Sequence, residues 1–185
     1  MKREQLEHLL RASANVLNDW SRTKGKREFV VLGSQSILGQ HPDAPVEVLR
    51  SMEADVYPRS SPELAEILDG ALGELSPFHD THGYYAQGVG PETAVLPVGW
   101  EDRLVRIDTP SSAPGVGLCL DAHDLAIAKY VAGRTKDLEF TAQLAHHGLT
   151  QRTTLLDRLA ATKIPSATRR LVEQRIASHF RTSRS

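Results

Sequence analysis

Two acidic residues, Glu53 and Asp55, lie two positions apart in a run of extended-type sequence, MEADVYP. Because side chains alternate between the faces of a strand, both carboxylates should point the same way. Two carboxylates held close together repel each other, and such a pair is tolerated when it is exposed or when a cation lies between the two groups. Carboxylate oxygens suit Mg²⁺ or Mn²⁺. The pair therefore indicates a divalent metal site with Glu53 and Asp55 as ligands.

A second polar group precedes this pair along the chain. The run FVVL ends at Gly33, and a short helix is expected to begin at Ser34 and Gln35, with Ser34 near its N-cap. The first N–H groups of a helix have no partner within the helix, so they can bind an anion. Each feature is common on its own. In this order, an anion site beside a carboxylate pair predicts one ligand, a nucleoside triphosphate (NTP) with its metal ion.

The elements that would position these groups follow from the spacing of apolar residues and from Gly and Pro. Helices are expected over residues 3–19 and 61–73, and buried strands over residues 28–33 and 53–57. Further extended segments are expected in YYAQGV, ETAVLP, DRLVRI and GVGLCL. From residue 121 only helices are expected, ending with one over residues 165–180. The sequence thus predicts an α+β part, residues 1–120, followed by a helical C-terminal part, residues 121–185.

Composition excludes several classes of protein. The 185 residues include one cysteine, Cys119, which rules out a disulfide framework and an all-cysteine zinc site, and its apolar surroundings predict a buried thiol. No apolar run is long enough to span a membrane, and the polar N-terminus is unlike a signal peptide, so a cytoplasmic protein without a membrane partner is expected. Residues 40–124 are acidic and residues 125–185 basic. The basic stretch fits either a polyanion-binding surface or ordinary solvated helices.

The order of these features resembles the nucleotidyltransferase superfamily that includes polymerase beta and kanamycin nucleotidyltransferase. In that superfamily a hydrophobic strand, Gly-Gly or Gly-Ser and a short helix precede Asp-x-Asp or Asp-x-Glu on a strand. The matching residues here are Gly33, Ser34, Glu53 and Asp55. The later segment HDLAIAKYVAGRTKDLEF is similar to the AbiEii-type branch, in which D-L-x-x-x-K is followed by R-x-K-D. The matching positions there are Asp124, Lys129, Arg134, Lys136 and Asp137.

The resemblance, which spans roughly residues 28–147, implies a nucleotidyltransferase-like mixed sheet with flanking helices. It implies transfer of a nucleoside monophosphate (NMP) from an NTP to an acceptor hydroxyl, with pyrophosphate leaving. Glu53 and Asp55 would hold Mg²⁺, which stabilises the attacking and leaving oxygens. Gly33, Ser34 and Gln35 would bind the β- and γ-phosphates through backbone N–H groups and the Ser34 hydroxyl.

The resemblance also assigns roles in the helical part. Lys129 and Arg134 would neutralise triphosphate charge, and Asp137 would orient one of them. Lys136 is interpreted as a surface residue. AbiEii-type proteins include toxins of toxin–antitoxin systems, so a tRNA 3′ end is one implied acceptor and a cognate antitoxin one implied partner.

The chain departs from the superfamily pattern in three respects. The first carboxylate is Glu53 rather than Asp, and this longer side chain can still bind Mg²⁺. Residues 35–52 form a long connection, which is expected to border the active site as a loop. The superfamily often has a third carboxylate on a later strand, but residues 84–89 carry no acid, and Asp108 is the remaining candidate.

Other functions remain open at this point. The acceptor could be a protein hydroxyl or a small molecule such as an aminoglycoside. The fold could also serve as a non-catalytic nucleotide sensor or partner-binding module. His79-x-x-His82 has a spacing seen in metal sites, and His123-Asp124 resembles the His-Asp pair of metal phosphohydrolases. Both histidine hypotheses need further metal ligands from elsewhere in the chain.

Overall fold

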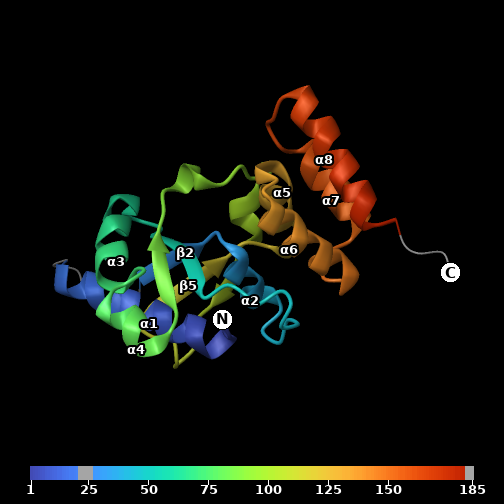
Figure 1. The fold of residues 1–185 in the computed structure, drawn as a ribbon. Coiled ribbons are helices and arrows are strands. Elements are labelled where there is room, and N and C mark those ends of the chain that lie inside the picture. Colours follow the sequence, from blue (N-terminus) through green and yellow to red (C-terminus); the bar gives the residue numbers. More distant parts are fainter. Residues whose placement is uncertain (21–26, 182–185) are drawn as a thin grey trace.

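The computed structural model describes residues 1–20 and 27–181. A mixed sheet with the strand order β3-β2-β1-β5-β4 lies at the centre of the N-terminal part. Its strands are β1 (Arg27–Val31), β2 (Glu53–Pro58), β3 (Tyr85–Gly88), β4 (Val105–Ile107) and β5 (Gly115–Cys119). The pairs β1–β5 and β2–β3 are parallel, whereas β1–β2 and β4–β5 are antiparallel. This confirms the α+β class, with flanking helices and a helical C-terminal half (Figure 1).

Helices α1 (Arg3–Trp20) and α3 (Ala65–Leu72) cover one face of the sheet. A Cβ added at Gly117 would touch Leu10 of α1, and one added at Gly88 would touch the backbone of Ala65 in α3. Leu10 belongs to a stripe of fully buried leucines at helical spacing, the pattern that makes an amphipathic helix pack on a sheet. Gly88 pairs with Val56, so the residues of β2 that alternate with Val56 lie on the opposite face. Those residues include Glu53 and Asp55.

The C-terminal half consists of α5 (Ala122–Ala132), α6 (Thr135–His146), α7 (Arg152–Ala160) and α8 (Ser166–His179). Helix α5 contacts the other three and also the short helix α2 (Ile37–Gln40), which follows β1. Asp121 caps its start, where the carboxylate accepts the His123 N–H, and Gly133 caps its end in the left-handed conformation (φ 66°). Figure 1 shows α5 and α6 beside α2, with α7 and α8 farther out, while α1, α3 and α4 (Pro77–His82) lie on the other side of α2. The boundary expected at residue 120 falls between β5 and α5.

Three local predictions differ from the structure. The segment 92–97, expected to be extended, begins as a 3-10 turn (Pro91–Thr93) and pairs with none of the described strands. Pro91, just before this segment, and Pro97, at its end, lack the N–H that a ladder needs. The segment 102–107 is a strand only from Val105, because a second 3-10 turn (Trp100–Arg103) precedes it. Helix α4 was not expected, although Ser76 caps it and Pro77 occupies its first position.

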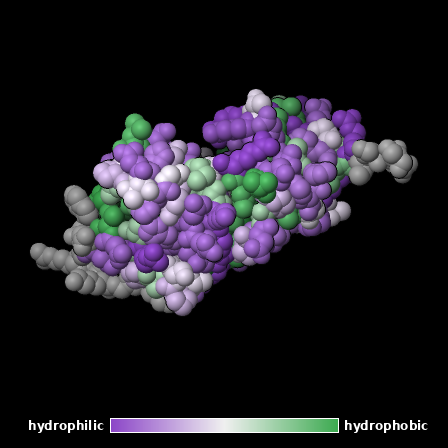
Figure 2. All heavy atoms as spheres, turned by 60° about the horizontal axis from the view of Figure 1, so that its bottom comes forward, coloured by the Kyte–Doolittle hydropathy of each residue, from purple (hydrophilic) through white to green (hydrophobic). Residues whose placement is uncertain are grey.

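Cys119 is buried as expected, and its burial raises the pKa of the thiol to about 12. None of the described helices is long and apolar enough to cross a lipid bilayer. The face drawn in Figure 2 is largely hydrophilic, with hydrophobic side chains in small separate patches. The most exposed large hydrophobic residues are likewise dispersed along the chain, at Val46, Leu75 and Val98.

Candidate active site

The first wall of the site is built where β1 and β2 run side by side. Asp55 lies directly against Gly33, so that a Cβ added at Gly33 would come within 1.9 Å of Asp55 Oδ2. Gly33 has an ordinary extended conformation (φ −75°, ψ −173°), and glycine is therefore needed for space rather than for backbone freedom. Ser34 follows at the start of the 3-10 turn (Ser34–Ser36) that leads into α2. The proposed phosphate-binding turn and the second carboxylate are thus in contact.

Glu53, the other carboxylate, is held by groups around the start of β2. Its Oε2 accepts a hydrogen bond from the Tyr85 hydroxyl at 3.4 Å, because Tyr85 is the register partner of Glu53 on β3. Its backbone N–H donates to Ser51 Oγ at 3.1 Å. The side chain of Gln35 donates from Nε2 to the Ser51 carbonyl at 2.8 Å and is fully buried. Gln35 therefore links the turn after β1 to the chain entering β2, with its side chain inside the protein.

The two carboxylates affect each other. Burial, together with a hydrogen bond and negative charge from Glu53, raises the pKa of Asp55 from 3.8 to about 6, and the charges of Lys129 and Lys136 only partly offset this. The ionised pair is thus unfavourable without a cation nearby. The oxygen ligands and their mutual repulsion fit a bound Mg²⁺ or Mn²⁺, for which Glu53 and Asp55 would supply carboxylate oxygens.

The second wall comes from the junction of α5 and α6, and its centre is the buried Asp137. Lys129 Nζ lies 3.2 Å from Asp137 Oδ1, and Arg134 Nε lies 2.7 Å from Oδ2. Burial raises the pKa of Asp137, but the hydrogen bond from Arg134 and the charge of Lys129 outweigh it and leave the pKa below its usual value. The side chain of Lys129 is only 16% exposed, whereas that of Arg134 is 62% exposed. Asp137 therefore fixes both cations in place.

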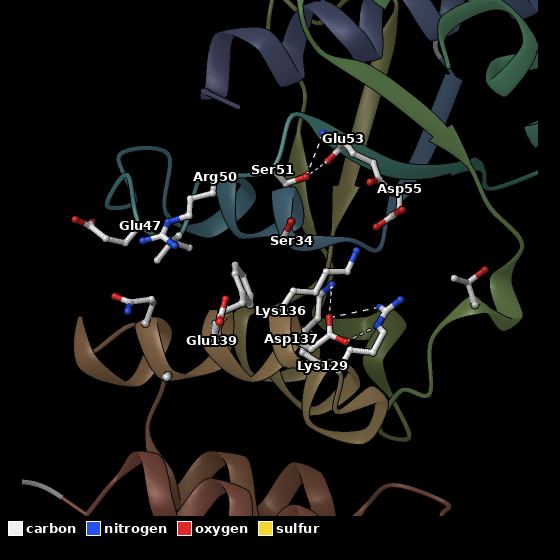
Figure 3. Close-up of a pocket in the computed structure, with 16 residues that line it drawn as sticks. Ser34, Glu47, Arg50, Ser51, Glu53, Asp55, Lys129, Lys136, Asp137 and Glu139 are labelled. Atoms are coloured by element: carbon white, nitrogen blue, oxygen red, sulfur yellow. Dashed lines mark hydrogen bonds and ion pairs between the residues drawn. The ribbon is translucent and has the colours of Figure 1, made fainter. Parts of the chain in front are cut away.

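The two walls face each other across a cleft of about 630 Å³. Figure 3 shows Ser34, Glu53 and Asp55 on one side and Lys129, Lys136 and Asp137 on the other. Within the described residues, the cleft is lined by Ser34, Glu47, Val48, Arg50, Ser51, Glu53, Asp55, Thr93, Lys129, Arg134, Lys136, Asp137, Glu139, Phe140, Ala142 and Gln143. The connection between α2 and β2 borders the cleft through Glu47, Val48, Arg50 and Ser51.

The sequence interpretation missed several of these residues. Lys136, interpreted as a surface residue, is exposed but lines the cleft and lowers the pKa of Asp55 through its charge. The placement of Lys136 could have been inferred from Asp137, since the two are neighbours at the start of α6. Arg50, Phe140 and Gln143 carry no motif, and only the packing of the loop against α6 reveals them.

The histidines of the two alternative metal-site hypotheses make hydrogen bonds and ring contacts within the fold. His123 Nε2 lies 2.8 Å from Gln151 Oε1, and His123 Nδ1 lies 3.2 Å from the helix-capping Asp121. His79 accepts the Leu75 N–H and packs against Tyr85, while the His82 ring packs on other rings. In residues 1–20 and 27–181, no three His, Cys, Asp or Glu side chains gather as a metal site.

The remaining acidic candidates also lie in ion pairs away from the cleft. Asp124 is fully buried and binds Arg103 through two hydrogen bonds of 2.8 and 3.0 Å, with Arg158 at 3.1 Å. It therefore ties α5 to α7 and to the segment before β4. Asp108, considered as a third carboxylate, pairs with Arg106 at 3.2 Å. Neither acid lines the cleft.

Part of the basic charge of the C-terminal half is also used inside the fold. Arg158 pairs with Asp124. Arg169 donates to the carbonyls of Leu159 and Thr162 at the end of α7, and Arg175 donates to the Tyr130 carbonyl at 2.6 Å. The N–H donors of these three arginines are engaged within the fold, which leaves fewer of them to bind a polyanion.

Comparison with known families agrees with this geometry. A family model described as a nucleotidyltransferase of unknown function (DUF6036) matches residues 7–176. The match covers all the residues that line the cleft. No curated protein and no solved structure gives a significant match. Since the family model covers most of the chain, this protein belongs to the DUF6036 family of nucleotidyltransferases.

Proposed function

We propose that this protein transfers an NMP from a Mg²⁺-bound NTP to an acceptor hydroxyl in the cleft between β2 and α6. The observation that carries the proposal is the contact of Asp55 with Gly33, opposite the pair formed by Lys129 and Asp137. The carboxylate pair, the turn at Ser34 and the cations held by Asp137 line a single cleft. A metal-bound triphosphate needs these three elements.

Each wall has its own part in this reaction. The turn at Ser34 offers a hydroxyl and the free N–H groups at the start of a helix to the phosphates. Lys129 and Arg134, oriented by Asp137, would balance the negative charge that builds on the departing pyrophosphate. The metal ion held by Glu53 and Asp55 would stabilise the attacking and leaving oxygens. The acceptor oxygen would then form a bond to the α-phosphorus, the bond from that phosphorus to pyrophosphate would break, and the hydroxyl proton would pass to solvent.

The acceptor is the less constrained part of the proposal. A tRNA 3′ end is the first to test, because the segment from Asp124 to Asp137 resembles AbiEii-type toxins, and a cognate antitoxin would then be a partner. The exposed Lys163, Arg170 and Arg181 remain available for an RNA backbone. A hydroxyl on another protein or on a small molecule would use the same cleft.

The test is transfer of label from each of the four α-³²P-labelled NTPs, with Mg²⁺ or EDTA. Total tRNA, the protein itself and an aminoglycoside serve as acceptors, and an Asp55→Asn variant serves as the control. We expect an acceptor to gain label only with Mg²⁺ and only with the wild-type protein. Binding of NTP without transfer to any of these acceptors would favour the nucleotide sensor. Failure of all four NTPs to bind would refute the proposal.

A further inference from the structure

The cleft continues beyond the carboxylates and fixed cations into a second part with different chemistry. This distal part lies between the loop that precedes β2 and the middle of α6, and it is lined by Glu47, Val48, Arg50, Glu139, Phe140 and Gln143. Figure 3 shows Glu47, Arg50 and Glu139 toward one end of the cleft and Asp55 and Asp137 away from them. The loop and α6 approach each other again at its outer edge, where Glu47 lies 3.8 Å from His147 Nε2.

The positions of its residues along α6 show how far the distal part extends from the cations. Lys136, Phe140 and Gln143 follow one another at intervals of four and three residues, so they lie on one face of the helix. At a rise of about 1.5 Å per residue, Phe140 is about 6 Å and Gln143 about 10 Å beyond Lys136 along the axis. A sugar and base attached to an α-phosphate near Asp55 would span a similar length.

The chemistry of the distal part suits an uncharged aromatic ring better than phosphate. Phe140 on α6 and the buried Val48 on the loop contribute apolar surface from opposite walls. In the distal part the acids Glu47 and Glu139 outnumber the single cation Arg50, whereas three cations gather at the other end, at Lys129, Arg134 and Lys136. Among the described residues, the side-chain amide of Gln143 has no hydrogen-bond partner, so its donors and its acceptor remain available.

We propose that Phe140 and Gln143 form the nucleobase subsite, where the ring of Phe140 stacks on the base and the amide of Gln143 reads its edge. This inference rests on the proposed function and adds the direction of the bound NTP, with phosphates at the start of α6 and the base toward its end. Phe140 would supply affinity for any base, because every base has a face on which an aromatic ring can stack. Gln143 would supply preference among bases, because their edges differ in donors and acceptors.

The test compares a ligand that has a base with one that lacks it. Binding of the four α,β-methylene NTPs and of inorganic tripolyphosphate, each with Mg²⁺, is measured by calorimetry for the wild type and for Phe140→Ala. We expect Phe140→Ala to weaken NTP binding about tenfold or more, equivalent to about 1.4 kcal/mol, and to leave tripolyphosphate binding unchanged. Phe140→Trp should retain NTP binding. His146→Ala, which changes an exposed ring on the same helix, is the matched control.

The outcomes separate this inference from the function on which it rests. If neither NTP nor tripolyphosphate binds the wild type, the proposed function fails. If both bind and Phe140→Ala changes neither, the base lies elsewhere and the inference is wrong. Unchanged NTP binding with slower transfer would instead assign Phe140 to the acceptor, which also overturns the inference.

A second variant tests whether Gln143 discriminates between bases. Gln143→Leu keeps a side chain of similar size but removes the donors and the acceptor. We expect the wild type to bind at least one NTP several-fold more tightly than another, and Gln143→Leu to reduce that difference. The same ranking and the same ratios in both proteins would exclude Gln143 as the residue that discriminates between bases.

Discussion

Replacing Asp55 by asparagine should stabilise the metal-free protein while abolishing NMP transfer. The reason is that Asp55 is partly buried beside Glu53, so its ionised form is unfavourable in the folded state. Asparagine has nearly the same shape, cannot ionise, and still fits against Gly33. It would remove one of the two proposed metal ligands, however, because an amide oxygen is a weaker ligand for Mg²⁺ than a carboxylate.

The size and pH dependence of the effect follow from the pKa. The folded protein raises the pKa of Asp55 from 3.8 to about 6, so it binds that proton more tightly than the unfolded chain does. The wild type should therefore lose stability relative to Asp55→Asn as the pH rises from about 4 to about 6, and the difference should stay constant above that. At about 1.4 kcal/mol per pKa unit, the full difference is at most about 3 kcal/mol. For a chain of this length, each kcal/mol moves the Tm by about 2–4 °C.

The assay is urea and thermal unfolding in EDTA at pH 4 and pH 8, for the wild type, Asp55→Asn and Glu66→Gln. Glu66 is an exposed acid on α3, so neutralising it controls for the change in net charge. Mg²⁺ with a non-hydrolysable NTP should then stabilise the wild type much more than Asp55→Asn, because ligand stabilisation depends on affinity. If Asp55→Asn is no more stable than the wild type at pH 8, or gains equally at both pH values, the reasoning about Asp55 is refuted.

Three other substitutions test different contacts. Lys129→Ala should slow transfer about a hundredfold or more, close to ~3 kcal/mol of transition-state stabilisation, and a wild-type turnover would make Lys129 a structural partner of Asp137 only. Gly33→Ala should remove most of the transfer activity with little loss of stability, because the new methyl group displaces the Asp55 side chain. Transfer rates and thermal unfolding of the same variant will show whether activity falls without a matching fall in stability. Asp124→Asn should instead destabilise the protein by about 1–3 kcal/mol in urea unfolding, because the partly exposed Arg103 and Arg158 lose their charged partner. A loss below about 0.5 kcal/mol would contradict that role.

The fold could be predicted where local pattern determines the element. Helix α1 follows from its buried leucines, and β1, β2 and β5 follow from short apolar runs, so the expected and observed bounds differ by only one or two residues. The prediction for segment 92–97 was wrong because its residue pattern resembles that of a strand. Strand pairing also needs a free sheet edge next to the segment and backbone N–H groups that can donate to it. Helix α4 is too short to show a periodic pattern of apolar residues, and only its capping serine and its first-turn proline indicate a helix.

The site could be predicted in part, for physical reasons that differ between residues. The common orientation of Glu53 and Asp55 follows from the two-residue repeat of any strand. The contact of Asp55 with Gly33 depends on the β1–β2 register, which local sequence does not specify. The pairing of Lys129 with Asp137 could be inferred only from the family resemblance. The two residues lie on different helices, α5 and α6, and they come into contact only when those helices pack at a particular angle. The burial of the Gln35 side chain and the placement of Phe140 depend on loop packing, about which a single sequence says little.

The sheet order has a consequence for how the protein is made. β1 pairs with β2, which follows soon after it, and also with β5, where Val30 meets Leu118 far along the chain. During synthesis the carboxylates and the turn at Ser34 can therefore come together early, through contacts that are close in sequence. The cationic wall is translated later, and β5 must close a long loop against β1 before α5 and α6 can dock, which is a slow type of step. The protein should thus pass through a nascent stage with an acidic half-site and no counter-charge, and acquire triphosphate affinity only after α6 has left the ribosome.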